Sequence, residues 1–135
     1  MVQMTAQPGL LPLMEYLATR GIRNAICTRN FDRPVQHLLD TFLKDVEISP
    51  IVTRAFKPPK PDPAGVQHIS RVWGMPTSEM IMVGDSLDDM LAGRRAGTRT
   101  VLLLAGSGSN AHVAKDESTD CVIDRWPPLS LYSNL

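Results

Sequence analysis

The residues best suited to chemistry lie between positions 80 and 97, in the segment MIMVGDSLDDMLAGRRAG. An apolar run ends at Gly84 and is followed at once by Asp85, with Asp88 and Asp89 close behind. In an open α/β sheet, binding sites lie just outside the carboxyl ends of the strands. Mg²⁺ in such a site is held by one or two carboxylates, and water and substrate phosphate complete its coordination. The pattern therefore predicts a metal-binding carboxylate at Asp85.

These acidic residues have a second interpretation, as the start of a helix. Aspartate caps helix N-termini, and its charge complements the helix dipole. Ser86 or Asp88 can fill this role, because the apolar spacing from Leu87 onward predicts a helix. A capping role does not explain Asp85, which stands directly after Gly84 at the expected end of a strand.

Two further polar residues, Thr28 and Asn30, follow an apolar run that predicts a strand over 23–27. A hydroxyl and an amide at a strand end, together with backbone N–H groups of the turn, suit the oxygens of a phosphate. The same residues could instead cap a helix that is expected to begin near Pro34. Taken alone, the cap is the better interpretation.

Lys60 stands in a proline-dense loop, KPPKPDP, over residues 57–63. Proline restricts φ and stiffens the chain, so this loop would hold a lysine in one position. A solvated surface lysine is the alternative, and for Lys57 we adopt it. Polar clusters thus occur in the order Thr28, Lys60, Asp85, and this order carries more information than any one of them.

Strands alternate with helices along the whole chain, and no internal repeat or linker divides it. Such alternation predicts one α/β domain over residues 1–135, with a Rossmann-like parallel sheet and helices on both faces. The expected strands lie near 23–27, 48–52, 80–83, 100–104 and 121–123, and the expected helices near 10–18, 34–46, 66–73, 87–96 and 111–115.

Composition excludes several classes of partner. The net formal charge is zero and no basic block appears, so nucleic acid is not expected to bind. No apolar run approaches membrane-spanning length and no secretory signal is recognisable, so we expect a cytoplasmic protein without a membrane partner. Cys27 and Cys121 both lie in apolar runs, which predicts buried, unpaired thiols in a reducing compartment.

The three polar clusters, in this order, resemble the core of the haloacid dehalogenase superfamily, whose members are mostly phosphatases. The matching segments are ICTRN at 26–30, KPDP at 60–63 and GDSLDD at 84–89. The last of these is quite specific, whereas the other two are short and gain weight from their order. The resemblance covers nearly the whole chain, from about Gly9 to Ile123.

The resemblance implies a role for each residue. Thr28 would bind phosphate, with Asn30 beside it, and Lys60 would steady both the phosphate and the attacking group. Asp85 would be the direct Mg²⁺ ligand. Asp89, or with less support Asp88, would support the metal shell or the lysine. The implied substrate is a small phosphorylated metabolite.

The chain departs from the family at its nucleophile. The family attacks phosphorus with the first Asp of a DxD segment at the end of a central first strand, and the second Asp acts as general acid and base. This chain has no Asp before Asp32 and no DxD anywhere, and Asp120 and Asp124 do not have that spacing. We therefore expect a truncated core that lacks its central strand and its cap and is inactive alone. A remnant that only binds metal, phosphate or a protein partner is the alternative.

A glycine pattern suggests a different function. Residues 106–111 read GSGSNA, a GxGxxA run after the expected strand at 100–104, and Asp124 stands 18 residues past Gly106. This is the outline of a dinucleotide-binding module. The helix that would follow is short and polar, and a lone glycine pattern is weak evidence, so a surface loop is the favoured interpretation.

Overall fold

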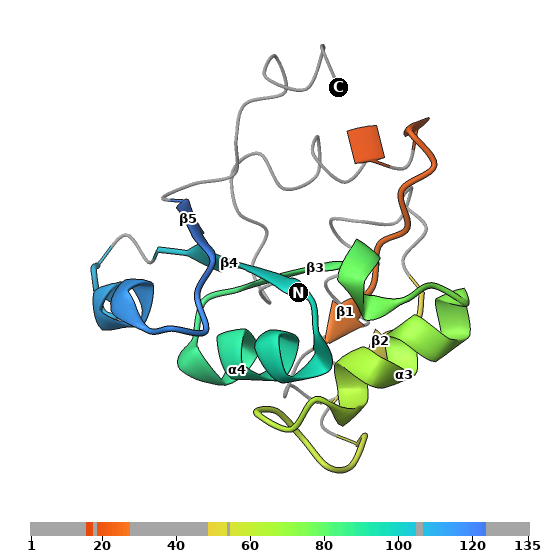
Figure 1. Cartoon of the computed structure of the whole chain (residues 1–135), viewed down its shortest axis with the longest axis horizontal. Helices are drawn as coiled ribbons and strands as arrows, with labels where there is room; N and C mark the ends of the chain where they lie inside the picture. Colours follow the sequence, from red (N-terminus) through yellow and green to blue (C-terminus); the bar gives the residue numbers. More distant parts are fainter. Residues whose placement is uncertain (1–15, 18, 28–48, 54, 105–106, 124–135) are drawn as a thin grey trace.

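The computed structural model describes residues 16–17, 19–27, 49–53, 55–104 and 107–123 (Figure 1). Its strands are β1 (Ile26–Cys27), β2 (Ile51–Val52), β3 (Ile81–Gly84), β4 (Arg99–Leu103) and β5 (Cys121–Ile123). Its helices are α3 (Ala64–Trp73) and α4 (Leu87–Ala96), with the 3₁₀ helices η1 (Thr77–Glu79) and η2 (Ala111–Lys115). The helix expected over 34–46 and most of the helix expected over 10–18 lie outside the described residues.

All strand pairs in the described part of the chain are parallel. β1 pairs with β2, and in a second sheet β4 lies between β3 and β5. Parallel neighbours need crossover connections, and α4 supplies one between β3 and β4. Both α3 and α4 lie on the same side of the strands (Figure 1). The predicted α/β class with a Rossmann-like parallel sheet is confirmed.

β1 and β3 belong to separate sheets, and a cavity of about 750 Å³ lies between them. Its walls come from the segment that leads into β1, from α3 and from β3, and include Asn24, Ile69 and Met82. Neighbouring strands in a sheet lie about 4.8 Å apart, whereas these two strands share no hydrogen bonds. β1 and β3 are therefore not paired with each other in the described part of the chain.

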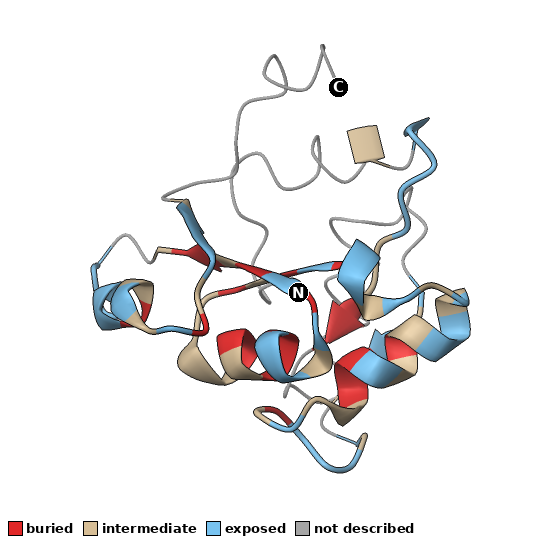
Figure 2. Cartoon of the chain, in the orientation of Figure 1, coloured by how far each residue is buried: buried red, intermediate tan, exposed pale blue. Residues whose placement is uncertain are grey.

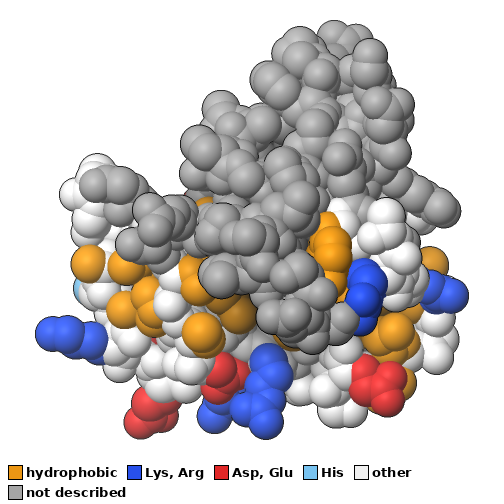
Figure 3. Space-filling view, turned by 90° about the horizontal axis from the view of Figure 1, so that it is seen from above, with side chains coloured by type: hydrophobic (Ala, Val, Ile, Leu, Met, Phe, Trp, Pro, Cys, Tyr) orange, Lys and Arg blue, Asp and Glu red, His pale blue; other side chains and the backbone are white. Residues whose placement is uncertain are grey.

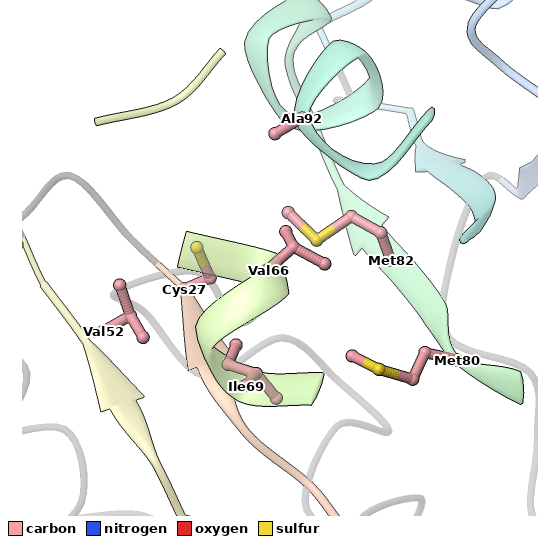
Figure 4. Close-up of a cluster of buried hydrophobic side chains, with 7 residues drawn as sticks. All are labelled: Cys27, Val52, Val66, Ile69, Met80, Met82 and Ala92. Carbon is pink, nitrogen blue, oxygen red and sulfur yellow. The ribbon is translucent and has the colours of Figure 1, made fainter. Parts of the chain in front are cut away.

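One apolar core joins the two sheets (Figure 4). Val66 and Ile69 of α3 pack between the side chains of β1 and β2 and those of β3. The buried members of this core are Cys27, Val52, Val66, Ile69, Met80, Met82 and Ala92. Figure 2 shows that the buried face of α3 is turned toward the strands and its opposite face is exposed. Burial on α3, rather than strand pairing, therefore holds the two described sheets together.

Local signals in the sequence set both ends of α4. The Ser86 side chain accepts a hydrogen bond from the Asp89 N–H, at 3.2 Å, and so caps the first turn. Arg94 and Arg95 lie in the last turn, where positive charge complements the helix dipole. Gly97 ends the helix in the left-handed conformation, with φ of 98°. This start and stop agree with the helix predicted over 87–96.

The prediction for the cysteines is correct for one and wrong for the other. Cys27 is buried, whereas Cys121 is exposed, and both thiols are free. Within the described residues β5 pairs only with β4, so it forms an edge of its sheet and Cys121 is not covered from the other side. Apolar neighbours in the sequence predicted burial, but the position of the strand in the sheet decides it.

The surface of the described part carries both signs of charge. On the face shown in Figure 3, acidic and basic side chains are interspersed, with apolar side chains between them. Among the described helices, none has the length and hydropathy needed to cross a membrane.

Candidate functional site

Lys60 lies at the carboxyl end of β1, buried in spite of its charge. Only 7% of the residue is exposed. Its Nζ donates a hydrogen bond to the main-chain oxygen of Cys27, the last residue of β1, at 3.0 Å. The second partner of the ammonium is the carboxylate of Asp89. A buried charge is tolerated when it is paired and hydrogen-bonded, and Lys60 satisfies both conditions.

Asp89 connects this lysine to the end of β3. It lies in the first turn of α4 and is 1% exposed. One carboxylate oxygen contacts Lys60, and the other accepts a hydrogen bond from the backbone N–H of Asp85, at 3.1 Å. Asp85 directly follows Gly84, the last residue of β3. The Lys60–Asp89 ion pair thus links the carboxyl ends of β1 and β3, although these strands belong to different sheets.

Gly84 allows Asp89 to approach the strand end this closely. A Cβ atom built at Gly84 would overlap the Cβ, Cγ and Oδ2 atoms of Asp89. Asp89 cannot move away without losing Lys60 and the Asp85 N–H. Glycine is therefore required here for close packing, since any side chain would displace the carboxylate.

Asp85 is the more exposed of the two carboxylates beside Lys60. It is half-buried, and burial raises the pKa of its carboxyl, with a further increase from the nearby Asp89 carboxylate; the Lys60 ammonium lowers it. Its backbone oxygen accepts a hydrogen bond from Asn110 Nδ2, at 2.7 Å. The proximity of two carboxylates to a single lysine gives this cluster a net negative charge, which favours a cation.

Hydrogen bonds to α4 and to the start of α3 hold the residues that follow Lys60 in its loop. Arg95, in the last turn of α4, donates a hydrogen bond to the Pro61 main-chain oxygen at 3.3 Å. The Asp62 carboxylate accepts from the Ala64 N–H at 2.9 Å, where α3 begins. These contacts and the neighbouring prolines fix the path of the loop on both sides of Lys60.

The donor set fits Mg²⁺ better than it fits a transition metal. Among the described residues, no group of three or more His, Cys, Asp or Glu side chains is close enough to hold a metal ion. Asp85 and Asp89 offer carboxylate oxygens alone, and Asp89 is already engaged by Lys60. A hard cation that takes one or two carboxylates and fills its remaining positions with water and phosphate suits such a site.

The structure brings together three of the residues singled out from the sequence: Lys60, Asp85 and Asp89. Thr28 and Asn30 lie outside the described residues. Sequence reasoning missed Asn110, which appeared only as a member of the GxGxxA run. η2, which follows that run, is a 3₁₀ helix over Ala111–Lys115.

Known proteins resemble this chain over most of its length. The family model for haloacid dehalogenase-like hydrolases matches residues 2–97. An uncharacterized hydrolase of Saccharomyces cerevisiae is 48% identical over 106 residues, which cover 76% of this chain and 48% of the yeast protein. A phosphoglycolate phosphatase of Pseudomonas fluorescens is 33% identical over 118 residues, which cover 87% of this chain and 43% of that enzyme. The chain thus spans about half the length of these relatives.

Solved structures share its fold. The D,D-heptose 1,7-bisphosphate phosphatase of B. bronchiseptica, complexed with magnesium and phosphate, superimposes with a TM-score of 0.77 at 20% identity. The match covers 96% of this chain and 85% of that one. At this identity the likeness shows the fold alone. The family match over residues 2–97 nevertheless identifies the chain as a member of the haloacid dehalogenase-like hydrolases.

Proposed function

We propose that this chain carries the phosphate- and Mg²⁺-binding part of a phosphomonoester phosphatase. The observation that carries the proposal is the buried Lys60–Asp89 pair beside Asp85, at the point where β1 and β3 end. Removing a lysine and two carboxylates from water is costly, and apolar side chains of similar volume could fill the same space. Such groups are found where a charged substrate is bound.

The family and its named relatives support this reaction class. The Pseudomonas relative acts as a phosphoglycolate phosphatase, and the B. bronchiseptica structure of the same fold is named as a sugar-bisphosphate phosphatase with magnesium and phosphate. We infer a small phosphorylated metabolite as the substrate class.

Each residue has a distinct task in the proposed site. Lys60 offers its positive charge to a phosphate oxygen, and Thr28 and Asn30 supply hydroxyl and amide donors. Asp89 holds the ammonium of Lys60 in place, and Asp85 binds the metal. When bound, Mg²⁺ neutralises charge on the phosphate oxygens.

We propose that an attacking group, where there is one, comes from outside these residues. In the family's reaction, a carboxylate oxygen forms a bond to phosphorus while the ester oxygen leaves and takes a proton. Water then cleaves the aspartyl phosphate and releases inorganic phosphate. Because no DxD segment occurs in the 135 residues, we propose that this chain alone binds phosphate without hydrolysing its esters. The same observation favours a second candidate, a non-catalytic protein that binds metal, phosphate or a protein partner.

Hydrolysis of p-nitrophenyl phosphate distinguishes these candidates. We would compare the chain alone with a version preceded by an apolar strand that ends in Asp-x-Asp. We expect background rates from the first and Mg²⁺-dependent turnover from the second, abolished by asparagine at the first Asp or by Lys60→Ala. If the extended version folds but stays inactive, the non-catalytic function is favoured. If the chain alone turns over and loses activity in Lys60→Ala, a carboxylate within it, such as Asp88 or Asp89, must be the nucleophile.

A further inference from the structure

The glycine-rich segment after β4 turns one polar side chain back into the protein. Gly108 adopts a φ of 77°, and two residues later Asn110 is buried, with 8% of its surface exposed. Ser107 and Ser109, on the same turn, are exposed. The segment therefore presents Asn110 to the interior, whereas its serines face solvent.

Asn110 connects the carboxyl ends of two neighbouring strands. Its Nδ2 donates to the main-chain oxygen of Leu103, the last residue of β4, at 3.0 Å. The same nitrogen donates to the main-chain oxygen of Asp85, just beyond β3, at 2.7 Å. Asparagine is the short side chain that offers two N–H donors from one nitrogen. Serine would offer one donor, and leucine of similar size would offer none.

The backbone of Asp85 is consequently held at both of its polar groups. Asp89 accepts from its N–H at 3.1 Å, and Asn110 donates to its carbonyl at 2.7 Å. Fixing both ends of one residue restricts its φ and ψ, and these angles set the direction of the Cα–Cβ bond. The hydrogen bond from the Asn110 side chain thus restrains the main chain from which the Asp85 carboxyl projects.

We propose that Asn110 is a positioning residue for Asp85 and that it increases the affinity of this site for Mg²⁺. The inference rests on the proposed function, in which Asp85 is the metal ligand. Loss of a partner that orients a metal ligand typically weakens metal binding by about 10–100-fold. The proposal also gives the GxGxxA run a role, because this run places Asn110 against Asp85 in the β3–α4 turn.

Mg²⁺ titration of the whole chain, followed through the backbone amide resonances of residues 84–89, tests the proposal. We expect Asn110→Leu to raise the dissociation constant at least about tenfold. Val113→Ala is the matched control, because Val113 is a buried residue of η2 whose apolar side chain packs with Met90 and Leu102 and offers no hydrogen-bond donor to the Asp85 carbonyl. It should lose stability but bind Mg²⁺ like the unaltered chain. Equal affinities for Asn110→Leu and the unaltered chain would overturn the proposal.

Two further measurements keep the proposal testable. If Asn110→Leu does not fold, the Mg²⁺ titration of the unaltered chain tests the proposal instead. Its Asn110 side-chain amide resonances should shift with the same Mg²⁺ midpoint as the Asp85 backbone amide. If the Asn110 side-chain amide resonances do not shift when Mg²⁺ is added, the positioning role is refuted. Asp85→Asn separates the two levels of inference. If the unaltered chain responds and Asp85→Asn does not, the metal site stands whatever Asn110 does; if the unaltered chain fails to respond, both inferences fall.

Discussion

Replacing Asp89 by asparagine tests how strongly the Lys60–Asp89 pair stabilises the fold. The two side chains are 6% and 1% exposed, so solvent screens the charges very little. Removing one partner of a buried ion pair costs about 3–5 kcal/mol, because the other charge stays buried and unpaired. A domain of this size has about 5–15 kcal/mol of stability in total. We therefore expect a melting temperature lower by roughly 10–20 °C.

A double-mutant cycle isolates the interaction itself. In Lys60→Met/Asp89→Asn neither charge remains. The double variant should therefore lose less free energy of unfolding than the two single variants lose in sum, by at least about 2 kcal/mol. Urea unfolding, followed by far-UV circular dichroism and tryptophan fluorescence, gives each free energy of unfolding. The exposed Arg94–Asp120 pair, 2.7 Å between Nη1 and Oδ1, is the control, and its coupling should be much smaller because solvent screens the two charges. If the losses at Lys60 and Asp89 add within about 0.5 kcal/mol, the buried pair does not stabilise the fold as argued.

Three other changes follow from the same geometry. Gly84→Ala should displace Asp89 and lower the free energy of unfolding by about 1–3 kcal/mol, measured by urea unfolding; an unchanged midpoint would contradict the overlap argument. Because burial raises the pKa of Asp85, its ionised form costs free energy at neutral pH. Asp85→Asn should therefore raise the free energy of unfolding at pH 7 in EDTA. The Mg²⁺ affinity of the unaltered chain should fall as the pH falls through the pKa of Asp85, and a calorimetric titration in which the affinity rises instead would refute this expectation. The Thr100 N–H and Arg94 lower the pKa of Asp120, so its stabilisation is present above the unfolded pKa of about 3.9 and is lost as pH falls through the lower folded pKa. Asp120→Asn should then reduce stability by more at pH 7 than at acidic pH, and an equal loss at both would disprove the linkage.

The sequence by itself determined most strands and helices of the described part and the order of the polar clusters. Apolar runs placed the strands of the described part to within a few residues, since a strand or helix reveals its buried face through local periodicity. Ser86 and Gly97 marked the two ends of α4, because capping depends on near neighbours in the chain. The strand-end position of Asp85 was readable for the same local reason.

Only the tertiary structure decided which side chains meet. Lys60 and Asp89 are 29 residues apart, and Asn110 and Asp85 are 25 apart. No local pattern encodes such contacts, because they depend on how the loops cross the ends of the strands. The exposure of Cys121 and the separation of β1 from β3 likewise follow from strand order, which is a property of the assembled sheet. The sequence indicated Lys60, Asp85 and Asp89, and packing decided that these residues form one connected network with Asn110.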